Sequence, residues 1–133
     1  MGSLIGNGQL NVQGHWYLLK NKIVQTGFQN LSAYGENKTV YYASNGQMQY
    51  GQQQLNGHWY LFDKISGAMQ TGFQNLSAYG ENKTVYYASN GQMQYGQQQL
   101  NGHWYLFDKI SGAMQTGFQN LSAYGENKTV YYA

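Results

Sequence analysis

The sequence has no cysteine, no arginine and few charges of either sign. Without cysteine, the chain can form neither a disulfide nor a thiolate metal site. Seven lysines against five acidic residues give a net charge of +2, and only 9% of the residues are charged. There is no basic stripe to neutralise a phosphate backbone, so we expect no nucleic-acid partner. The longest apolar runs are only a few residues, which excludes insertion into a membrane.

The residue sets that carry catalysis or hold ions are also missing. We find no pair of carboxylates, no Ser/His/Asp set and no Gly-rich phosphate loop. His15, His58 and His103 occur once per period, without a second His or an acidic cluster beside them. We therefore expect no enzyme activity, no cofactor and no metal, and we interpret these histidines as strand-surface or ligand-edge residues.

The sequence does contain an internal repeat. Residues 27–71 recur unchanged as residues 72–116, and the first 17 residues of that block return as 117–133. A fixed period of this length is typical of repeat proteins, in which each unit packs on its neighbours. Each period splits into two stretches. We predict a leader and lead-in at residues 1–7 and a repeat domain at 8–133, with units 8–26, 27–50, 51–71, 72–95, 96–116 and an incomplete 117–133.

The two stretches of a period each predict a β-hairpin. Asn45-Gly46 separates residues 39–43, which are rich in β-branched and aromatic side chains, from residues 47–50. Asn-Gly between two such runs is a strong hairpin signal. In the second stretch, residues 58–62 and 68–71 flank a longer loop, and we expect them to pair as well.

The segments between these hairpins, 27–37 and 51–57, are predicted to be linkers, with Leu31 or Leu55 pointing inward. An isolated two-stranded hairpin is marginally stable in water, so successive hairpins must cover each other's aromatic faces. The predicted fold is all-β, an elongated β-solenoid or superhelix of stacked β-hairpins.

Two segments carry a resemblance to a known family. Residues 57–63, GHWYLFD, are followed by residues 67–73, GAMQTGF, and the sister unit has Val40-Tyr41-Tyr42 followed by residues 46–52, GQMQYGQ. This pattern resembles the cell-wall-binding repeats of Gram-positive bacteria, which include choline-binding and glucan-binding repeats. The resemblance implies a non-catalytic module that attaches a secreted protein to a polymer of the cell wall.

The resemblance also implies where a ligand would bind. Choline-binding members hold a quaternary ammonium in an aromatic box that uses the aromatic residue after the leading Gly, a cation–π contact. Here that position alternates between Phe, as in Phe28, and Gln, as in Gln52. The first aromatic of the run likewise alternates between Trp16 and Val40, with one residue of uncertainty in the register. At best every second interface forms a full box, so we favour a neutral cell-surface polysaccharide or an α-glucan.

A sugar ring would stack on aromatic side chains while Gln and Asn amides bind its hydroxyls. The candidate carbohydrate-binding residues are Trp16, Tyr17, Phe28, Tyr41, Tyr42, Gln52, Trp59, Tyr60, Phe73, Tyr86, Tyr87, Gln97, Trp104, Tyr105 and Phe118. On an alternating strand, roughly half of such rings pack between hairpins instead. Met48 and Met69 are interpreted as filler between hairpins. Glu36 and Lys38, with their copies, are interpreted as solvated pairs of little energetic weight.

Two alternative functions stay open at this point: a structural rod or spacer without a ligand, and a module that binds choline or teichoic acid. The strand that ends the sequence also predicts an end-to-end homodimer through an unpaired C-terminal edge.

Overall fold

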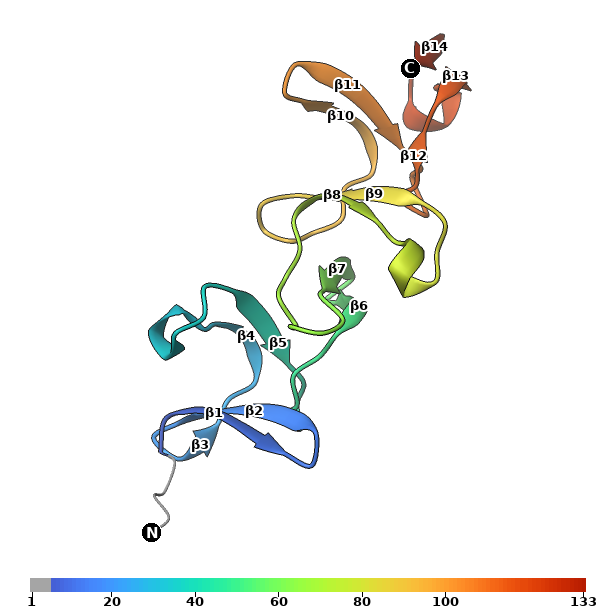
Figure 1. The fold of residues 1–133 in the computed structure, drawn as a ribbon. Coiled ribbons are helices and arrows are strands. Elements are labelled where there is room, and N and C mark those ends of the chain that lie inside the picture. The colour runs from blue at the N-terminus through green and yellow to red at the C-terminus, as the bar shows by residue number, and fades with distance from the viewer. Residues whose placement is uncertain (1–5) are drawn as a thin grey trace. The chain divides into compact units, whose positions relative to one another are not determined.

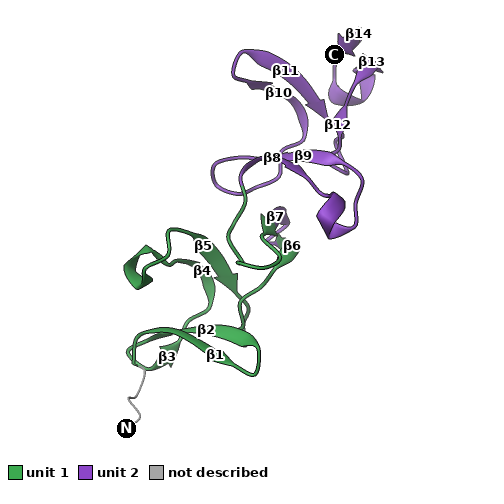
Figure 2. Ribbon diagram, viewed as in Figure 1, with its two compact units in different colours: residues 1–54, 61–70 green, residues 55–60, 71–133 purple. Residues whose placement is uncertain are grey.

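The computed structural model describes residues 6–133, so most of the predicted leader lies outside the described residues. The chain divides into two compact units (Figures 1 and 2). Unit 1 contains Met1–Gln54 with Leu61–Gln70, and unit 2 contains Leu55–Tyr60 with Thr71–Ala133. Each unit is described by itself below.

Unit 1 is built from short antiparallel strands. Its strands are β1 (Gly8–Val12), β2 (His15–Lys20), β3 (Ile23–Val24), β4 (Gly27–Asn30), β5 (Thr39–Tyr42) and most of β6 (Gly51–Leu55). Strands β1, β2 and β3 form one sheet in that order, and β4 pairs with β5 across a loop that holds the 3₁₀ helix η1 (Ser32–Tyr34). The hairpin of β6 and β7 (His58–Phe62) is divided between the two units.

Unit 2 repeats the same elements. Its strands are β8 (Gly72–Asn75), β9 (Thr84–Tyr87), β10 (Gly96–Leu100), β11 (His103–Phe107), β12 (Met114–Gln115), β13 (Gly117–Asn120) and β14 (Thr129–Tyr132). The 3₁₀ helices η2 (Ser77–Tyr79) and η3 (Ser122–Tyr124) occupy the loops of the β8–β9 and β13–β14 hairpins. The sheets are β8–β9, β10–β11–β12 and β13–β14.

The core lies between successive hairpins of a unit. In unit 1, Leu18 of β2 packs with Leu31, Val40, Tyr42 and Met48, all of which are buried. In unit 2, Leu106, Leu121 and Tyr132 form the corresponding cluster. The structure confirms the predicted fold class, an all-β solenoid of stacked hairpins, and the inward position of Leu31. The unit boundaries and the end-to-end dimer stay predictions.

The predicted pairings are present, but further strands form in the segments predicted to be linkers. The segments predicted to be linkers contain strands β4 and β6, and β5 pairs with β4 along its whole length. The predicted pairing across Asn45-Gly46 is also present, with a bridge between Tyr42 and Met48 flanked by backbone hydrogen bonds. In the second stretch Phe62 bridges Met69, and the next copy of this pairing is that of β11 with β12. The linker prediction is therefore wrong. Gly and Gln residues form a strand here because partners with β-branched and aromatic side chains supply the pairing and packing.

The Gln-rich hairpins also turn at an Asn-Gly pair, but not at the one used for the prediction. Asn56-Gly57 joins β6 to β7 with positive φ at both residues, 53° and 81°, and Asn101-Gly102 does the same between β10 and β11. Positive φ at both central positions is the requirement of a type I′ turn, which matches the twist of the two strands. The Asn-Gly signal for this hairpin therefore lies within residues 51–57, which were predicted to be a linker.

Candidate functional site

A groove in unit 1 brings together side chains from three successive hairpins. It contains Gln9 of β1, Trp16 of β2, Glu36 and Lys38 from the loop before β5, Met48 and Tyr50 after β5, and Ile65 and Ser66 from the loop after β7. We call it the Trp16 groove. Because its wall is assembled from segments up to 57 residues apart, its composition cannot be read from any local stretch.

Strand alternation explains why Trp16 lines the groove. Trp16 and Leu18 lie two residues apart on β2 and so project from the same face of the hairpin. Leu18 is only 1% exposed and belongs to the core, whereas Trp16 is 39% exposed. Gln9 pairs with Leu18 across the hairpin, so it shares this face. One face of the hairpin therefore runs from core at Leu18 to open groove at Trp16.

A chain of polar contacts forms another wall of the groove. The amide Nε2 of Gln9 donates to Oε2 of Glu36. The other carboxylate oxygen, Oε1, lies 2.9 Å from Nζ of Lys38, which also donates to the backbone oxygen of Ser66 at 2.7 Å. The hydrogen bond from Gln9 and the one from Lys38 hold the pKa of Glu36 below its ordinary value. The carboxylate is therefore ionised at neutral pH and accepts hydrogen bonds.

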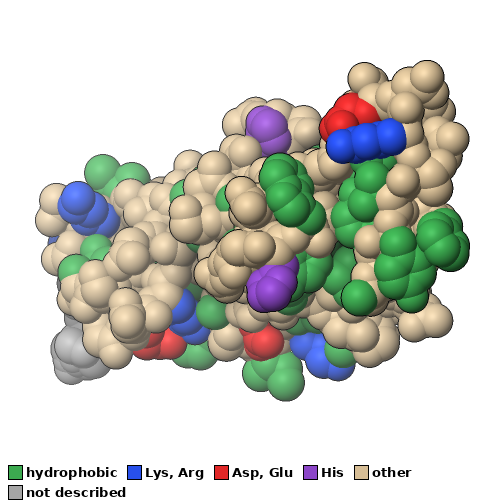
Figure 3. Space-filling view, turned by 90° about the horizontal axis from the view of Figure 1, so that it is seen from above, with side chains coloured by type: hydrophobic (Ala, Val, Ile, Leu, Met, Phe, Trp, Pro, Cys, Tyr) green, Lys and Arg blue, Asp and Glu red, His purple; other side chains and the backbone are tan. Residues whose placement is uncertain are grey.

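Unit 2 contains a second groove of this kind, the Trp104 groove, lined by Gln97, Trp104, Glu126, Lys128, Val130 and Tyr132. Gln97 Nε2 donates to Glu126, whose carboxylate lies 3.0 Å from Lys128 Nζ. Trp104 is 58% exposed. Figure 3 shows an acidic and a basic side chain side by side next to hydrophobic side chains on the face in view. The arrangement of Trp, Gln, Glu and Lys thus recurs.

Three contacts of the Trp16 groove and its surroundings recur in the intermediate copy within unit 2. Glu81 lies 3.0 Å from Lys83 Nζ, and Lys83 donates to the backbone oxygen of Ser111 at 2.7 Å. The backbone N–H of Met93 donates to the oxygen of Trp59 at 2.9 Å, as Met48 does to Trp16. These matches show that the identical sequence builds the same local geometry in successive periods.

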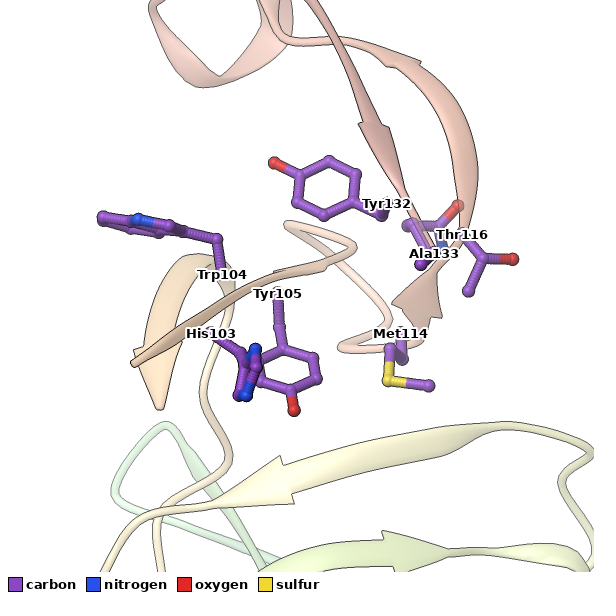
Figure 4. A pocket seen from close by; sticks show the side chains of 8 residues that line it. His103, Trp104, Tyr105, Met114, Thr116, Tyr132 and Ala133 are labelled. Carbon is purple, nitrogen blue, oxygen red and sulfur yellow. The ribbon is translucent and has the colours of Figure 1, made fainter. Parts of the chain in front are cut away.

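A further pocket of unit 2 lies beside Trp104. It is lined by His103, Trp104, Tyr105, Met114, Gln115, Thr116, Tyr132 and Ala133. Figure 4 shows the ring of Tyr132 extending toward the side of β11 that carries Trp104, with His103 and Tyr105 below. Trp104 therefore lines both this pocket and the Trp104 groove.

An aromatic cluster forms at the other kind of hairpin interface. The ring centroid of Phe73 lies 5.0 Å from those of both Tyr86 and Tyr105, and 6.2 Å from that of Phe107. Phe73 is 41% exposed and Phe107 is buried. We call Phe73, Tyr86, Tyr105 and Phe107 the Phe73 cluster. In unit 1, Phe28 repeats the contact with Tyr41 at 5.0 Å and that with Phe62 at 6.2 Å.

The strand register shows why the two interfaces differ. Asn11 pairs with Trp16 in one class of hairpin, and Asn30 pairs with Thr39 at the same place in the other. Thr39, rather than Val40, is therefore the structural counterpart of Trp16. The Phe-containing hairpins have no Trp at this position, and the Trp-containing hairpins have Gln9 or Gln97 where the others have Phe. Each class of hairpin therefore lacks one of the two aromatic residues, Trp or Phe, that a full aromatic box would combine.

The predicted site residues have different surroundings in the structure. Trp16, Trp104 and Gln97 line the grooves, while Phe28, Tyr41, Phe73, Tyr86 and Tyr105 form the Phe-containing clusters, with Phe118 contacting Tyr131 at 4.9 Å. Trp59 is exposed and Gln52 half-buried. The remaining predicted residues are packed between hairpins: Tyr17, Tyr42, Tyr60 and Tyr87.

These packed tyrosines fall into two kinds. The hydroxyls of Tyr17 and Tyr60 each accept a hydrogen bond of 3.1 Å, from Nε2 of Gln47 and of Gln92 respectively. Tyr42 and Tyr87 are 0% exposed, and within residues 6–133 no hydrogen-bond partner reaches their hydroxyls. Burial raises the pKa of Tyr42 to about 12. Both of these rings are core residues, because the last position of β5 and of β9 faces the interior.

Sequence reasoning missed the charged part of the groove. Glu36 and Lys38 were interpreted as a solvated pair, but Lys38 is half-buried and both residues line the Trp16 groove. Tyr50 was likewise not considered. The only available signal is that Glu-Asn-Lys returns once per period. The contact with Gln9 spans 27 residues, so no local pattern reveals it.

Among residues 6–133, no cluster of three or more His, Cys, Asp or Glu side chains is placed to hold a metal ion. No helix in this part of the chain has the length and apolar character needed to cross a membrane.

Comparisons with known proteins agree with this geometry. The structure resembles that of CbpJ from Streptococcus pneumoniae TIGR4, with a TM-score of 0.79, 34% sequence identity and 95% of this chain covered. It also resembles choline-binding protein F from Streptococcus pneumoniae, with a TM-score of 0.78, 30% identity and 96% coverage. Another structure of that protein, in the presence of a peptidoglycan analogue, gives a TM-score of 0.79 and 30% identity over 96% of this chain.

The chain spans 40% of the length of CbpJ and of the first of these protein F structures, and 39% of the second. No curated protein matches the sequence. The family described as choline-binding repeat matches residues 25–73 and 71–118. Together with the stacked hairpins and their recurring Trp and Phe positions, this match shows that the chain belongs to the choline-binding repeat family.

Proposed function

We propose that this chain is a non-catalytic module that binds a cell-surface polysaccharide or an α-glucan through its Trp grooves. The observation that carries the proposal is the recurrence, in both units, of an exposed indole with an ordered Gln–Glu–Lys chain in one groove. A pyranose stacks its CH face on an aromatic ring, and its hydroxyls need donors and acceptors held in place beside that ring. Trp16, Gln9, Glu36 and Lys38 supply these groups.

The charge balance of the groove supports a neutral ligand. Glu36 and Lys38 form an ion pair, so together they carry no net charge that would attract a charged polymer. The carboxylate and the ammonium are already oriented by Gln9 and Ser66, which reduces the ordering cost when a sugar binds. Grooves that recur along the chain raise the avidity for a polymer by about 10² or more without new contacts.

Affinity electrophoresis and isothermal titration against dextran and purified cell-wall polysaccharide test this function. We expect the wild-type protein to bind at least one of these polymers, and the variant Trp16→Ala/Trp59→Ala/Trp104→Ala to lose binding while keeping its circular dichroism spectrum. A folded wild-type protein that binds neither polymer contradicts the proposal and favours the structural rod.

A second candidate function is the binding of a quaternary ammonium group, such as choline, at the Phe73 cluster. Three observations favour it. Phe73 is partly exposed, two tyrosine ring centroids lie 5.0 Å from its own, and the chain belongs to the choline-binding repeat family. A cation held against such ring faces gains about 2 kcal/mol when desolvated. Choline at millimolar concentration should then raise the melting temperature more than sodium chloride of equal ionic strength, and Phe28→Ala/Phe73→Ala should remove the difference.

We further propose that the module holds a larger secreted protein at the bacterial cell wall. The chain spans well under half of the length of its relatives, which supports its role as one part of such a protein. Binding of a fluorescent fusion of this chain to intact Gram-positive cells tests the idea. Labelling equal to that of the triple Trp variant contradicts it.

A further inference from the structure

Ile65 is an exposed apolar residue held in a fixed position beside the Trp16 groove. It is 83% exposed, and Ile110, one period later, is 81% exposed. The backbone N–H groups of Ile65 and Ser66 donate to Oδ2 of Asp63 at 3.0 and 2.8 Å. The copy at Asp108 makes the same two bonds, at 2.9 and 2.8 Å. The backbone of the loop is therefore held in place where the Ile side chain leaves it.

Packing within the protein does not account for this position. A side chain with this exposure contributes little buried apolar area, so its contribution to folding is small. Ile65 nevertheless lines the same groove as Trp16 and Met48. An aliphatic group at the rim of a groove that an indole also lines is a suitable contact for a small apolar substituent on a ligand.

The polar groups of the groove complement an amide substituent. Lys38 Nζ has three N–H donors, and Glu36 and Ser66 use two of them. Gln9 donates through Nε2 to Glu36, and this orientation leaves its carbonyl Oε1 as an acceptor. The groove thus combines a donor, an acceptor, an aromatic face and an aliphatic contact.

We propose that the Trp16 groove selects sugars with a 2-acetamido group over the corresponding 2-hydroxyl sugars. This inference rests on the proposed carbohydrate function and specifies its ligand class. The sugar ring stacks on the indole, the acetamido carbonyl accepts from Lys38, its N–H donates to Gln9, and its methyl group contacts Ile65. A plain 2-hydroxyl leaves the aliphatic contact unused.

The test compares chitotetraose with cellotetraose, which share a β-1,4-linked backbone and differ only in acetamido against hydroxyl groups at C2. Isothermal titration is performed in a Trp59→Ala/Trp104→Ala background, so that the Trp16 groove is the indole site under test. We expect chitotetraose to bind about fourfold more tightly or better, the gain from burying one methyl group. Ile65→Ser/Ile110→Ser should abolish this preference, and Ile65→Val/Ile110→Val should retain it. These exposed positions can change without loss of the fold.

The outcomes separate this inference from the proposed function. Equal or tighter binding of cellotetraose, or a preference that survives the Ser variant, overturns the acetamido inference and leaves the carbohydrate function standing. Binding of dextran alone has the same meaning. Failure of the wild-type protein to bind either tetrasaccharide, dextran or purified cell-wall polysaccharide overturns both.

Discussion

Lys38 Nζ donates to the backbone oxygen of Ser66 at 2.7 Å and joins two hairpins whose loops are 28 residues apart. The same ammonium pairs with Glu36, so a single side chain fixes both the groove wall and the next loop. We expect Lys38→Met to lower the free energy of unfolding by about 1–2 kcal/mol, because a charged hydrogen bond and a partly exposed ion pair are lost.

Urea denaturation measures this effect, and Lys20→Met is the matched control. Lys20 is exposed on β2, so its replacement should change the stability by less than about 0.5 kcal/mol. An equal loss in both variants would show that the Lys38 contacts contribute nothing.

The buried hydroxyls of Tyr42 and Tyr87 predict an unusual response to substitution. Since no partner among residues 6–133 reaches them, Tyr42→Phe/Tyr87→Phe should leave the melting temperature unchanged or raise it. Tyr17→Phe is the comparison, because it leaves Gln47 without its hydroxyl partner and should cost about 1 kcal/mol. Differential scanning calorimetry measures the melting temperatures of the Phe double variant and of Tyr17→Phe. A clear loss of stability in the Phe double variant would mean that the hydroxyls are partnered.

Gly67 is predicted to be intolerant of a side chain. Its φ is +74°, and a Cβ there would lie 2.6 Å from Sδ of Met48. Gly57 has a similar φ of +81°, but a Cβ would meet nothing within 4 Å. Gly57→Ala therefore measures the backbone strain alone, on the order of 1 kcal/mol. Gly67→Ala should be more destabilising, because Met48 must move out of the core. Thermal denaturation of the two variants gives the difference, and equal losses would contradict the predicted clash.

Acid should lower the free energy of unfolding, because Glu36 becomes protonated. The pKa of this carboxyl is lowered in the folded protein by Gln9 and Lys38, so its contribution to stability is fully present above the unfolded value of about 4.3. That contribution is lost as the pH falls through the lowered folded value. The pKa values of Asp63 and Asp108 are also lowered, chiefly by the backbone N–H bonds of Ser66 and Ser111, and these groups add to the same loss.

Glu36→Gln separates these contributions. Urea denaturation between pH 7 and pH 3 should show a shallower loss of stability in this variant than in the wild-type protein. Identical pH profiles would mean that the groove contacts of Glu36 carry no linkage to folding.

The class of fold was predictable because it depends on short-range chemistry that the repeat displays several times. Asn-Gly turns and the runs of aromatic and β-branched residues indicate strands wherever they occur. The second partner was not predictable: residues 39–42 pair backward with residues 27–30 in addition to their contact with residues 47–49 across Asn45-Gly46. Backward pairing buries Val40 and Tyr42 against Leu18 and Leu31, and this tertiary gain decides the register.

The aromatic part of the candidate site was predictable for a similar reason, since Trp16, Phe73 and Trp104 recur at fixed places in the period. The polar part was not. Glu36 becomes a groove residue only because Gln9, on another hairpin, meets it, and Ser66 contributes a backbone oxygen, which carries no sequence signature.

The Trp16 groove draws its walls from three consecutive hairpins. Binding capacity should therefore not grow in simple proportion to chain length. One or two hairpins offer an indole without its complete polar and aliphatic surroundings, and each further hairpin that completes a set adds a finished groove. Each duplication of the 45-residue period would then add affinity in discrete steps, as further grooves are completed.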